Sequence, residues 1–401
     1  MGGGDDPEGA GDGDLAPAAL EALLTTDHPR KLAAAQWARE HLPVTDAFDP
    51  KRWAAAAEFG VQGMLVPAAL GGSGLSVVDA LLTFEGLGLG TDDQGTVFAL
   101  SAQVFAMQSA LLMAGSPDQL ARWVPDLCSG AAIGSFAMSE PDAGSDTAAI
   151  TTTATELDDG TFRIDGVKSW VTLGSVCDVM VVFAVTDPAA GRWGHTAFLV
   201  EMDRPGIDRG APIAKMGLGS CPFTTVTFDD CRVGPDAVLG SVGAGGAIFA
   251  DAVNAERAFL YAAQLGASER AMEVSIERAR TRTQFGRPIG SFQAVSHRIA
   301  DMKLHHEASR LLIYKAGALR DRGGDVTMAA ALAKLQTSES GVSTALDAIQ
   351  ILGAEGYTTD AQVERFLRDA VGGLSYSGTS DIQRNIVASL LRTDRPRRRR
   401  P

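Results

Sequence analysis

The sequence predicts a mainly α-helical protein with a β-sheet domain in its middle. Ala/Leu-rich segments of helical period precede residue 134, β-branched alternation occupies the middle, and the helical period returns near residue 244. The chain has 401 residues, 45% apolar and 21% charged, which is enough for two or three packed domains. We therefore expect a helical domain at 15–134, a β-domain at 135–243 and a helical bundle at 244–393.

The first region contains clear helical segments at 29–41, 51–59 and 118–128, separated by glycine and proline. A charge-free stretch at 94–117 is long enough to cross a membrane. Polar residues interrupt it, namely Ser101, Gln103, Gln108 and Ser109. The stretch therefore predicts a buried helix rather than a membrane span.

The middle region alternates β-branched and polar residues between turn residues, which predicts strands within 151–157, 159–172, 179–187, 195–203 and 224–233. Helices then continue to residue 392, with breaks near 286–290, 322–324, 353–357 and 372–378. We find no internal repeat and no glycine-rich phosphate loop after a strand. A Rossmann unit and a P-loop are therefore not supported.

Charge and cysteine usage exclude several classes of protein. The formal net charge is −14, which argues against a nucleic-acid binder. The four cysteines are far apart, so we expect no metal site and no disulfide framework, and reduced thiols favour the cytoplasm. We expect residues 1–14 to be a disordered acidic tail. Residues 394–401 form a basic tail, either a solvated end or an arm for an acidic partner.

Five segments are richer in polar and glycine residues than core or surface requires. They are FAMSEPDAGSD (136–146), KSWVT (168–172), RTRTQFGRPIGSFQAVSHRIADM (280–302), DAIQILGAEGYT (347–358) and LSYSGTSDIQRNIVASLL (374–391). Trp170 and Thr172 share one face of a strand and could flank a flavin ring. Arginines 278, 280, 282 and 287 crowd a helix junction, where a pyrophosphate could bind. Taken singly, each segment is also compatible with a turn, a helix cap, a core tryptophan or a solvated charge run.

In this order and spacing, the five segments resemble the acyl-CoA dehydrogenase family, and the resemblance covers nearly the whole chain. GVQGMLVPAALGGSGLS (60–76) is similar to the segment that precedes the family's acyl-pocket helices. MGLGSCPFTTVTFDDCRVGPDAVLG (216–240) is similar to the end of its β-domain. The resemblance implies an N-terminal helical domain, a β-sheet domain, a C-terminal four-helix bundle, bound FAD and a homo-oligomer, usually a tetramer of two dimers.

The resemblance also assigns FAD contacts. Met138, Ser139 and neighbouring Phe136 and Ser145 match the flavin-binding segment, and Trp170 and Thr172 match the pair beside flavin N5. Arg282, Phe285 and Gln293 match positions for the FAD diphosphate and adenosine. Gln350 and Gly353 match positions that reach the cofactor of a neighbouring subunit. Thr379 and Asp381 match contacts to the adenosine half, with Asp381 where the family often has Glu or Gln.

One departure from the family pattern concerns the catalytic base. Many members have YEGTS, whose glutamate removes the substrate α-proton, whereas this chain has Ser377 between Tyr376 and Gly378. A serine hydroxyl with no activating histidine is a poor base. Isovaleryl- and long-chain-type enzymes instead place the base before an arginine on the first bundle helix, and Glu256-Arg257 matches that position. We therefore expect Glu256 to be the base. The alternatives are that it is a helix-surface glutamate paired with a nearby arginine, or that the enzyme has lost dehydrogenation.

The expected reaction is FAD-dependent α,β-dehydrogenation of an acyl thioester. The main-chain N–H of Ser377 would bind the thioester oxygen, as in the family. Ser145, Arg257 and Tyr376 are expected near substrate, and Phe98, Ala102 and Ala106 match the acyl-tail helix, which suggests a short or medium acyl group. The carrier is either CoA or a carrier protein, since family members also serve polyketide pathways. The acceptor is either electron-transfer flavoprotein or oxygen. The alternative function is a flavin-dependent monooxygenase or another oxidase on the same fold.

Overall fold

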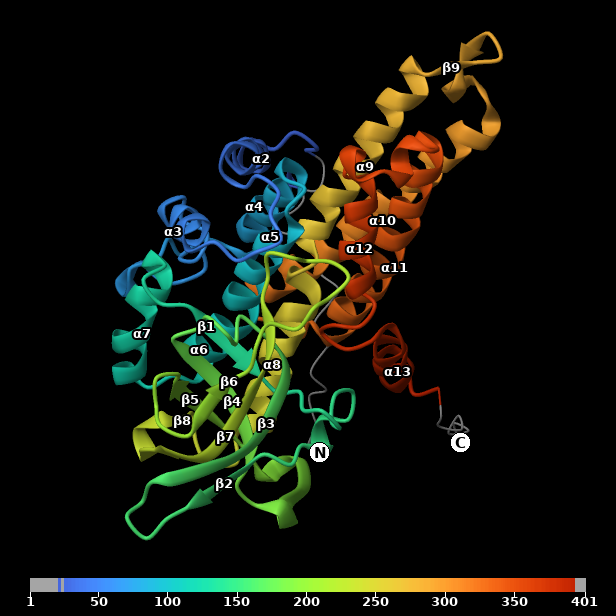
Figure 1. The fold of residues 1–401 in the computed structure, drawn as a ribbon. Helices are drawn as coiled ribbons and strands as arrows, with labels where there is room; N and C mark the ends of the chain where they lie inside the picture. Colours follow the sequence, from blue (N-terminus) through green and yellow to red (C-terminus); the bar gives the residue numbers. More distant parts are fainter. Residues whose placement is uncertain (1–20, 23–24, 394–401) are drawn as a thin grey trace, which may run out of the picture.

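The structure is a computed structural model and describes residues 21–22 and 25–393. The tails predicted at 1–14 and 394–401 lie outside the described residues. The predicted fold class is confirmed: an N-terminal helical region, a β-sheet region and a C-terminal helical bundle follow one another along the chain (Figure 1).

The N-terminal region is a layer of helices. Asp49 and Ser116 accept hydrogen bonds at the starts of two of these helices, each directly before a proline that fits the first helical position. The helices are α2 (Pro29–His41), α3 (Pro50–Glu58), α4 (Val77–Gly90), α5 (Gln94–Ala102), the π-helical turn η2 (Gln103–Met107), α6 (Gln108–Ala114) and α7 (Pro117–Ser129).

The charge-free stretch forms α5, η2 and α6 as one nearly continuous helix. It is long and apolar enough to cross a membrane, but 72% of its most apolar window is buried inside the structure. Figure 1 shows it between the other N-terminal helices and the start of the bundle. This stretch is therefore a core helix of the fold, as the polar interruptions predict.

The middle region is a mixed sheet in the order β6-β7-β3-β2-β4-β5-β8, with β1 pairing in parallel with β4. Alternate residues of β4 face two different cores. Val181 and Phe183 pack against helices, whereas Met180 and Val182 pack against β3 and β7. The strands are β1 (Gly134–Ala137), β2 (Thr153–Glu156), β3 (Phe162–Thr172), β4 (Val179–Val185), β5 (His195–Glu201), β6 (Ile207–Arg209), β7 (Phe223–Val233) and β8 (Val238–Leu239).

Five of these strands match the predicted ones, but β1, β6 and β8 were not predicted. They have only two to four residues, too few to show an alternation. Their β-structure comes from pairing with longer neighbours.

The C-terminal region is the bundle, whose helices end near the predicted breaks. A further break was not predicted: Leu260 and Tyr261 separate α8 from α9 while keeping helical backbone angles. The helices are α8 (Gly245–Phe259), α9 (Ala262–Thr281), α10 (Gln293–Asp321), α11 (Thr327–Leu352), α12 (Val363–Gly372) and α13 (Ser380–Leu390). A short hairpin, β9 (Thr283–Gln284) with β10 (Arg287–Pro288), joins α9 to α10 and projects from the far end of the bundle (Figure 1).

Candidate active site

Glu256 lies near the end of α8, the helix whose start packs against the sheet. Gly245 allows α8 to start against β5, because a Cβ at this position would lie 2.7 Å from the carbonyl oxygen of His195. α8 also packs against η2, α6 and α11. These contacts fix the direction in which the half-buried Glu256 side chain leaves the helix.

A loop between α12 and α13 crosses the end of α8. We call residues 373–379 the strap. Its carbonyl oxygens accept hydrogen bonds from the surrounding helices: Tyr261 binds Gly373 at 2.7 Å, and Arg257 binds Ser377 at 3.2 Å. From α13, Gln383 donates to the oxygens of Ser377 at 3.3 Å and Gly378 at 3.0 Å. The strap therefore has a fixed position over Glu256.

The strap brings Ser377 to Glu256. The Ser377 hydroxyl donates a hydrogen bond of 2.8 Å to Oε1 of Glu256. Ser377 has φ 55° and Gly378 has φ 87°, so two successive left-handed residues turn the strap back toward α8. A Cβ at position 378 would lie 2.8 Å from Nε2 of Gln383, which explains the glycine.

The neighbouring arginine does not pair directly with Glu256. The Arg257 guanidinium donates to Oδ1 of Asn254 at 3.1 Å and to the strap carbonyl of Ser377. Burial raises the pKa of Glu256 above its usual range, and the Ser377 hydrogen bond and the charge of Arg257 offset this only in part. Among the residues that the structure describes, no donor contacts Oε2 of Glu256. The main-chain N–H of Ser377 likewise has no acceptor among these residues.

A cavity opens along the same helix face as Glu256. Leu260, Ala263 and Ala267 line it, at the fourth, seventh and eleventh positions after Glu256, and the helical period therefore places them on one face. The other lining residues are Gln94, Phe98, Leu218, Gln264, Phe366, Asp369, Ala370 and Tyr376.

Of the predicted substrate positions, Phe98 and Tyr376 line this cavity and their rings meet edge to face at 4.7 Å. Ala102 and Ala106 are not among its lining residues; Ala106 is buried within η2. Arg257 touches the strap rather than the cavity. Ser145 is exposed in the loop after β1, away from Glu256 in the chain's β-domain.

The predicted flavin-binding residues of the β-domain lie side by side at the ends of β1 and β3. The Ser169 N–H donates to the Ser139 carbonyl at 2.9 Å, and the Ser135 hydroxyl donates to the Thr172 carbonyl at 2.7 Å. Met138 is buried beneath this edge, and the Phe136 ring packs against Phe183 at 5.0 Å. The structure thus uses the Phe136 side chain for packing and leaves only its main chain at the edge.

This edge fits a planar, polar cofactor. Trp170 is 60% exposed and has φ 59°, an unusual state for a large apolar side chain in a strand. A flat ring system stacked on the indole would cover it. Beside it, Ser139 and Thr172 are half-buried and can supply hydroxyl groups.

Another group of predicted FAD contacts lies at the opposite end of the molecule, around the β9–β10 hairpin (Figure 1). Phe285 is 92% exposed at the hairpin tip, and Arg282, Gln293, Gln350 and Gly353 are also exposed. An ion pair of 2.8 Å between Arg278 and Glu355 ties the hairpin end of α9 to the loop after α11. A single chain does not bring this group to Trp170.

The last two predicted contacts lie at the start of α13, next to the strap. Thr379 caps α13, since its hydroxyl accepts the N–H of Ile382 at 3.2 Å. Asp381 is exposed and pairs with Arg384 at 3.3 Å.

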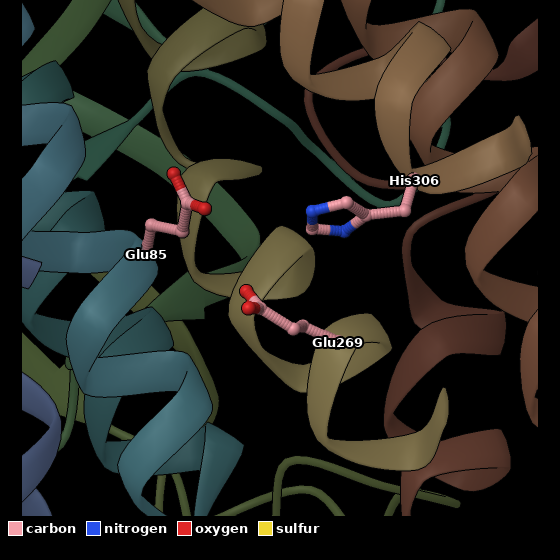
Figure 2. A group of neighbouring side chains, drawn as sticks. All are labelled: Glu85, Glu269 and His306. Atoms are coloured by element: carbon pink, nitrogen blue, oxygen red, sulfur yellow. The ribbon is translucent and has the colours of Figure 1, made fainter. Parts of the chain in front are cut away.

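A separate buried cluster lies between the N-terminal helices and the bundle. Glu85, Glu269 and His306 place ligand atoms within 4.8 Å of one another and point toward a common centre (Figure 2). Lys31 occupies this region: its ammonium group lies 3.1 Å from Glu85 and 2.5 Å from Glu269. Arg310 binds Glu85 at 3.0 Å. Two cations thus balance two carboxylates, and the group is an ion network rather than a metal site.

Sequence reasoning missed several residues around Glu256. Tyr261 stacks on Tyr376 with a ring distance of 5.5 Å, and Lys334 on α11 lies 3.5 Å from the strap carbonyl of Leu374. Burial lowers the pKa of Lys334 to about 8. The helical register from Glu256 could have identified Leu260, Ala263 and Ala267, but nothing local marks Lys334 or Asp369, because tertiary packing alone brings them here.

Comparisons with known proteins agree with this architecture. Sequence models of the N-terminal, middle and C-terminal domains of acyl-CoA dehydrogenase match residues 21–131, 135–231 and 243–391. The chain is 40% identical to L-prolyl-[peptidyl-carrier protein] dehydrogenase of Pseudomonas fluorescens, over 86% of this chain and 91% of that protein.

Solved structures agree as well. The FAD complex of PigA is 34% identical and superposes with a TM-score of 0.89, covering 96% of this chain and 100% of that one. Butyryl-CoA dehydrogenase from Megasphaera elsdenii is 30% identical, with a TM-score of 0.86 over 95% and 99% of the two chains. The chain therefore belongs to the acyl-CoA dehydrogenase family and is an FAD-dependent oxidoreductase that dehydrogenates acyl thioesters.

Proposed function

We propose that Glu256 is the base that removes the α-proton of the acyl thioester. The observation that carries this proposal is its position: half-buried beside the strap, one helical turn before the cavity-lining Leu260, with Oε2 free of any donor among the described residues. A carboxylate moved out of water has a raised pKa, which brings it nearer the range useful for accepting a proton at neutral pH.

The main-chain N–H of Ser377 supplies a hydrogen bond to the thioester oxygen. It donates to no other group of the described residues and lies on the residue that also contacts Glu256. Negative charge develops on this oxygen as the α-proton leaves, and a fixed donor stabilises it. The strap thus positions the base and the oxygen donor together.

When bound, FAD would supply the acceptor for the β-hydrogen and its electron pair, and residues of this chain would hold it in place. Ser139, Trp170 and Thr172 hold the flavin end, with the loop at Ser145 beside it, and Thr379 and Asp381 lie toward the adenosine half. The hairpin residues Arg282, Phe285 and Gln293, with Gln350 and Gly353, lie too far away to complete this site within one chain. We therefore infer a homo-oligomer in which a neighbouring copy supplies them.

The acyl group is small and is delivered by a carrier protein rather than by CoA. The relative from Pseudomonas fluorescens is named for a prolyl group on a peptidyl-carrier protein. The aromatic side chains of Phe98, Phe366 and Tyr376 line the cavity and narrow it, which favours a small ring or a short chain. We place the reaction in the cytoplasm, with electron-transfer flavoprotein or oxygen as the final electron acceptor.

The test is to mix the purified, flavin-loaded enzyme anaerobically with matched thioesters on CoA and on a carrier protein, and to follow flavin absorbance. We expect rapid bleaching by a prolyl or short acyl group on the carrier, faster than by the matching CoA thioester. Equal rates would contradict the carrier assignment. Bleaching only with an external reductase would contradict dehydrogenation and point to a monooxygenase.

A further inference from the structure

Ser377 offers Glu256 more than a main-chain neighbour, because its hydroxyl is the one hydrogen-bond donor to the Glu256 carboxylate among the described residues. The oxygen–oxygen distance of 2.8 Å is that of a good hydrogen bond. A hydroxyl can donate only one proton, so this bond fixes its orientation.

The strap holds this hydroxyl in place independently of Glu256. The carbonyl of the same residue accepts hydrogen bonds from Arg257 and Gln383, which approach from α8 and α13. Earlier in the strap, the Leu374 carbonyl accepts a hydrogen bond from Lys334 on α11. The donor to Glu256 is therefore anchored by three helices, and its position does not depend on substrate.

We propose that Ser377 is a positioning residue for the reaction: its hydroxyl holds Oε1 of Glu256, leaves Oε2 free to accept a proton and favours the ionised carboxylate. This inference rests on the proposed role of Glu256 as the base. Without the hydroxyl, the side chain would be free to rotate about its last torsion, and burial would oppose its ionisation without a compensating donor.

The other charged and titratable groups around Glu256 do not provide this function. Arg257 on the same helix is directed to Asn254 and to the strap. Burial raises the pKa of Tyr261 and of Tyr376, so both stay neutral below pH 10. Lys334 lies beyond Tyr261, 6.0 Å from its ring, and its pKa of about 8 places its titration on the alkaline side. Asp369, which lines the cavity, has a pKa raised by burial to about 7, so only the part of the acid limb that moves with the Ser377 substitutions is assigned to Glu256.

The experiment is the pH dependence of anaerobic single-turnover flavin reduction in wild type and Ser377→Ala. We expect the acid limb of Ser377→Ala to move to higher pH by about one unit, with a plateau rate lowered by up to about tenfold. Ser377→Gly, which also lacks the hydroxyl and suits the positive φ, should show the same shift, and it replaces Ser377→Ala if that variant does not fold. An acid limb that stays at the wild-type pH in both variants overturns the inference.

Tyr261→Phe is the matched control. It removes the hydrogen bond from Tyr261 to the Gly373 carbonyl, and hence a strap contact, but leaves the bond between Ser377 and Glu256. If the strap had only a structural role, Tyr261→Phe and Ser377→Ala would both lower the plateau rate of flavin reduction, and the acid limb would stay at the wild-type pH in both variants. The proposed function fails separately: if Glu256→Gln reduces flavin at the wild-type rate, the base lies elsewhere. If Glu256→Gln is inactive and the Ser377 variants keep the wild-type limb, only the positioning role is lost.

Discussion

Glu85 and Glu256 are helix glutamates removed from water in one protein, yet their acidities are shifted in opposite directions. Burial alone would raise the pKa of Glu85, but Arg310, Lys31 and the Tyr314 hydroxyl outweigh it, and the pKa lies below the usual range. Burial also raises the pKa of Glu256. The Ser377 hydroxyl and the charge of Arg257, whose guanidinium binds other groups, lower it by less than burial raises it.

Glu85 is fully buried and Glu256 is half-buried, but the direction of each pKa shift follows the partners of the carboxylate oxygens. Around Glu85, two cations and a phenol at 2.5 Å use both carboxylate oxygens. Around Glu256, one oxygen has a hydroxyl partner and the other has none among the described residues. A fully paired carboxylate stabilises the fold, whereas a partly paired one beside a cavity is available for proton transfer.

The largest effect should come from Glu256→Gln. The amide is nearly isosteric and can keep the contact with Ser377, but it cannot accept a proton, so we expect turnover to fall by about 10²- to 10⁴-fold with FAD still bound. Turnover and flavin content of the purified variant measure this. Glu307→Gln, on a surface pair with Lys303, is the control and should keep wild-type turnover. Wild-type turnover in Glu256→Gln would contradict the role of Glu256 as the base and, with it, the functional difference between Glu256 and Glu85.

Glu85→Gln should act on stability instead. It removes the Glu85 charge from both Lys31 and Arg310, while Lys31 keeps its pair with Glu269. Losing one partner of a buried ion network costs about 3–5 kcal/mol. Urea unfolding of the flavin-loaded enzyme measures the loss. Glu307→Gln should stay within about 0.5 kcal/mol of wild type. An equally small effect at Glu85 would mean that the network contributes little to the fold.

The ion network around Glu85 and His306 should make the protein less stable as the pH falls. Burial lowers the pKa of His306, so the unfolded chain binds more protons below the ordinary histidine value and stability falls as the pH drops below about 6.5. Glu85 adds a loss at lower pH, as the pH falls from its unfolded pKa through its depressed folded pKa. Melting temperatures at pH 7 and pH 5 test this, and His306→Gln should reduce the difference. An unchanged difference would exclude His306 as its source.

The smallest expected effect is an increase in thermal stability on replacing Glu256 with glutamine. Because the pKa of Glu256 is raised in the folded state, its contribution to stability is present below the unfolded pKa and is lost as the pH rises through the folded value. Glu256→Gln should therefore melt at a higher temperature than wild type at neutral pH, while Glu85→Gln melts at a lower one. Calorimetry of both variants in one buffer checks this, and a lower melting temperature for Glu256→Gln would contradict it.

The sequence predicted the order of the three regions and the approach of α8 to the strap, because long periodic segments and a family resemblance in register carry that information. It could not predict that the Ser377 hydroxyl meets Glu256, since that contact depends on two successive left-handed residues, Ser377 and Gly378. The network at Glu85 was also missed. Lys31 and Glu269 are separated by 238 residues, and no local pattern links them.

Infrared difference titration of the flavin-loaded enzyme can show whether the different partners of Glu85 and Glu256 shift the pKa values of these two carboxyl groups in opposite directions. Glu256→Gln and Glu85→Gln serve as references that assign each carboxyl band. We expect a protonated Glu256 band that persists above the ordinary glutamic acid pKa of 4.5, while Glu85 is already ionised there. A Glu256 carboxyl that ionises at or below the same pH as Glu85 would contradict it.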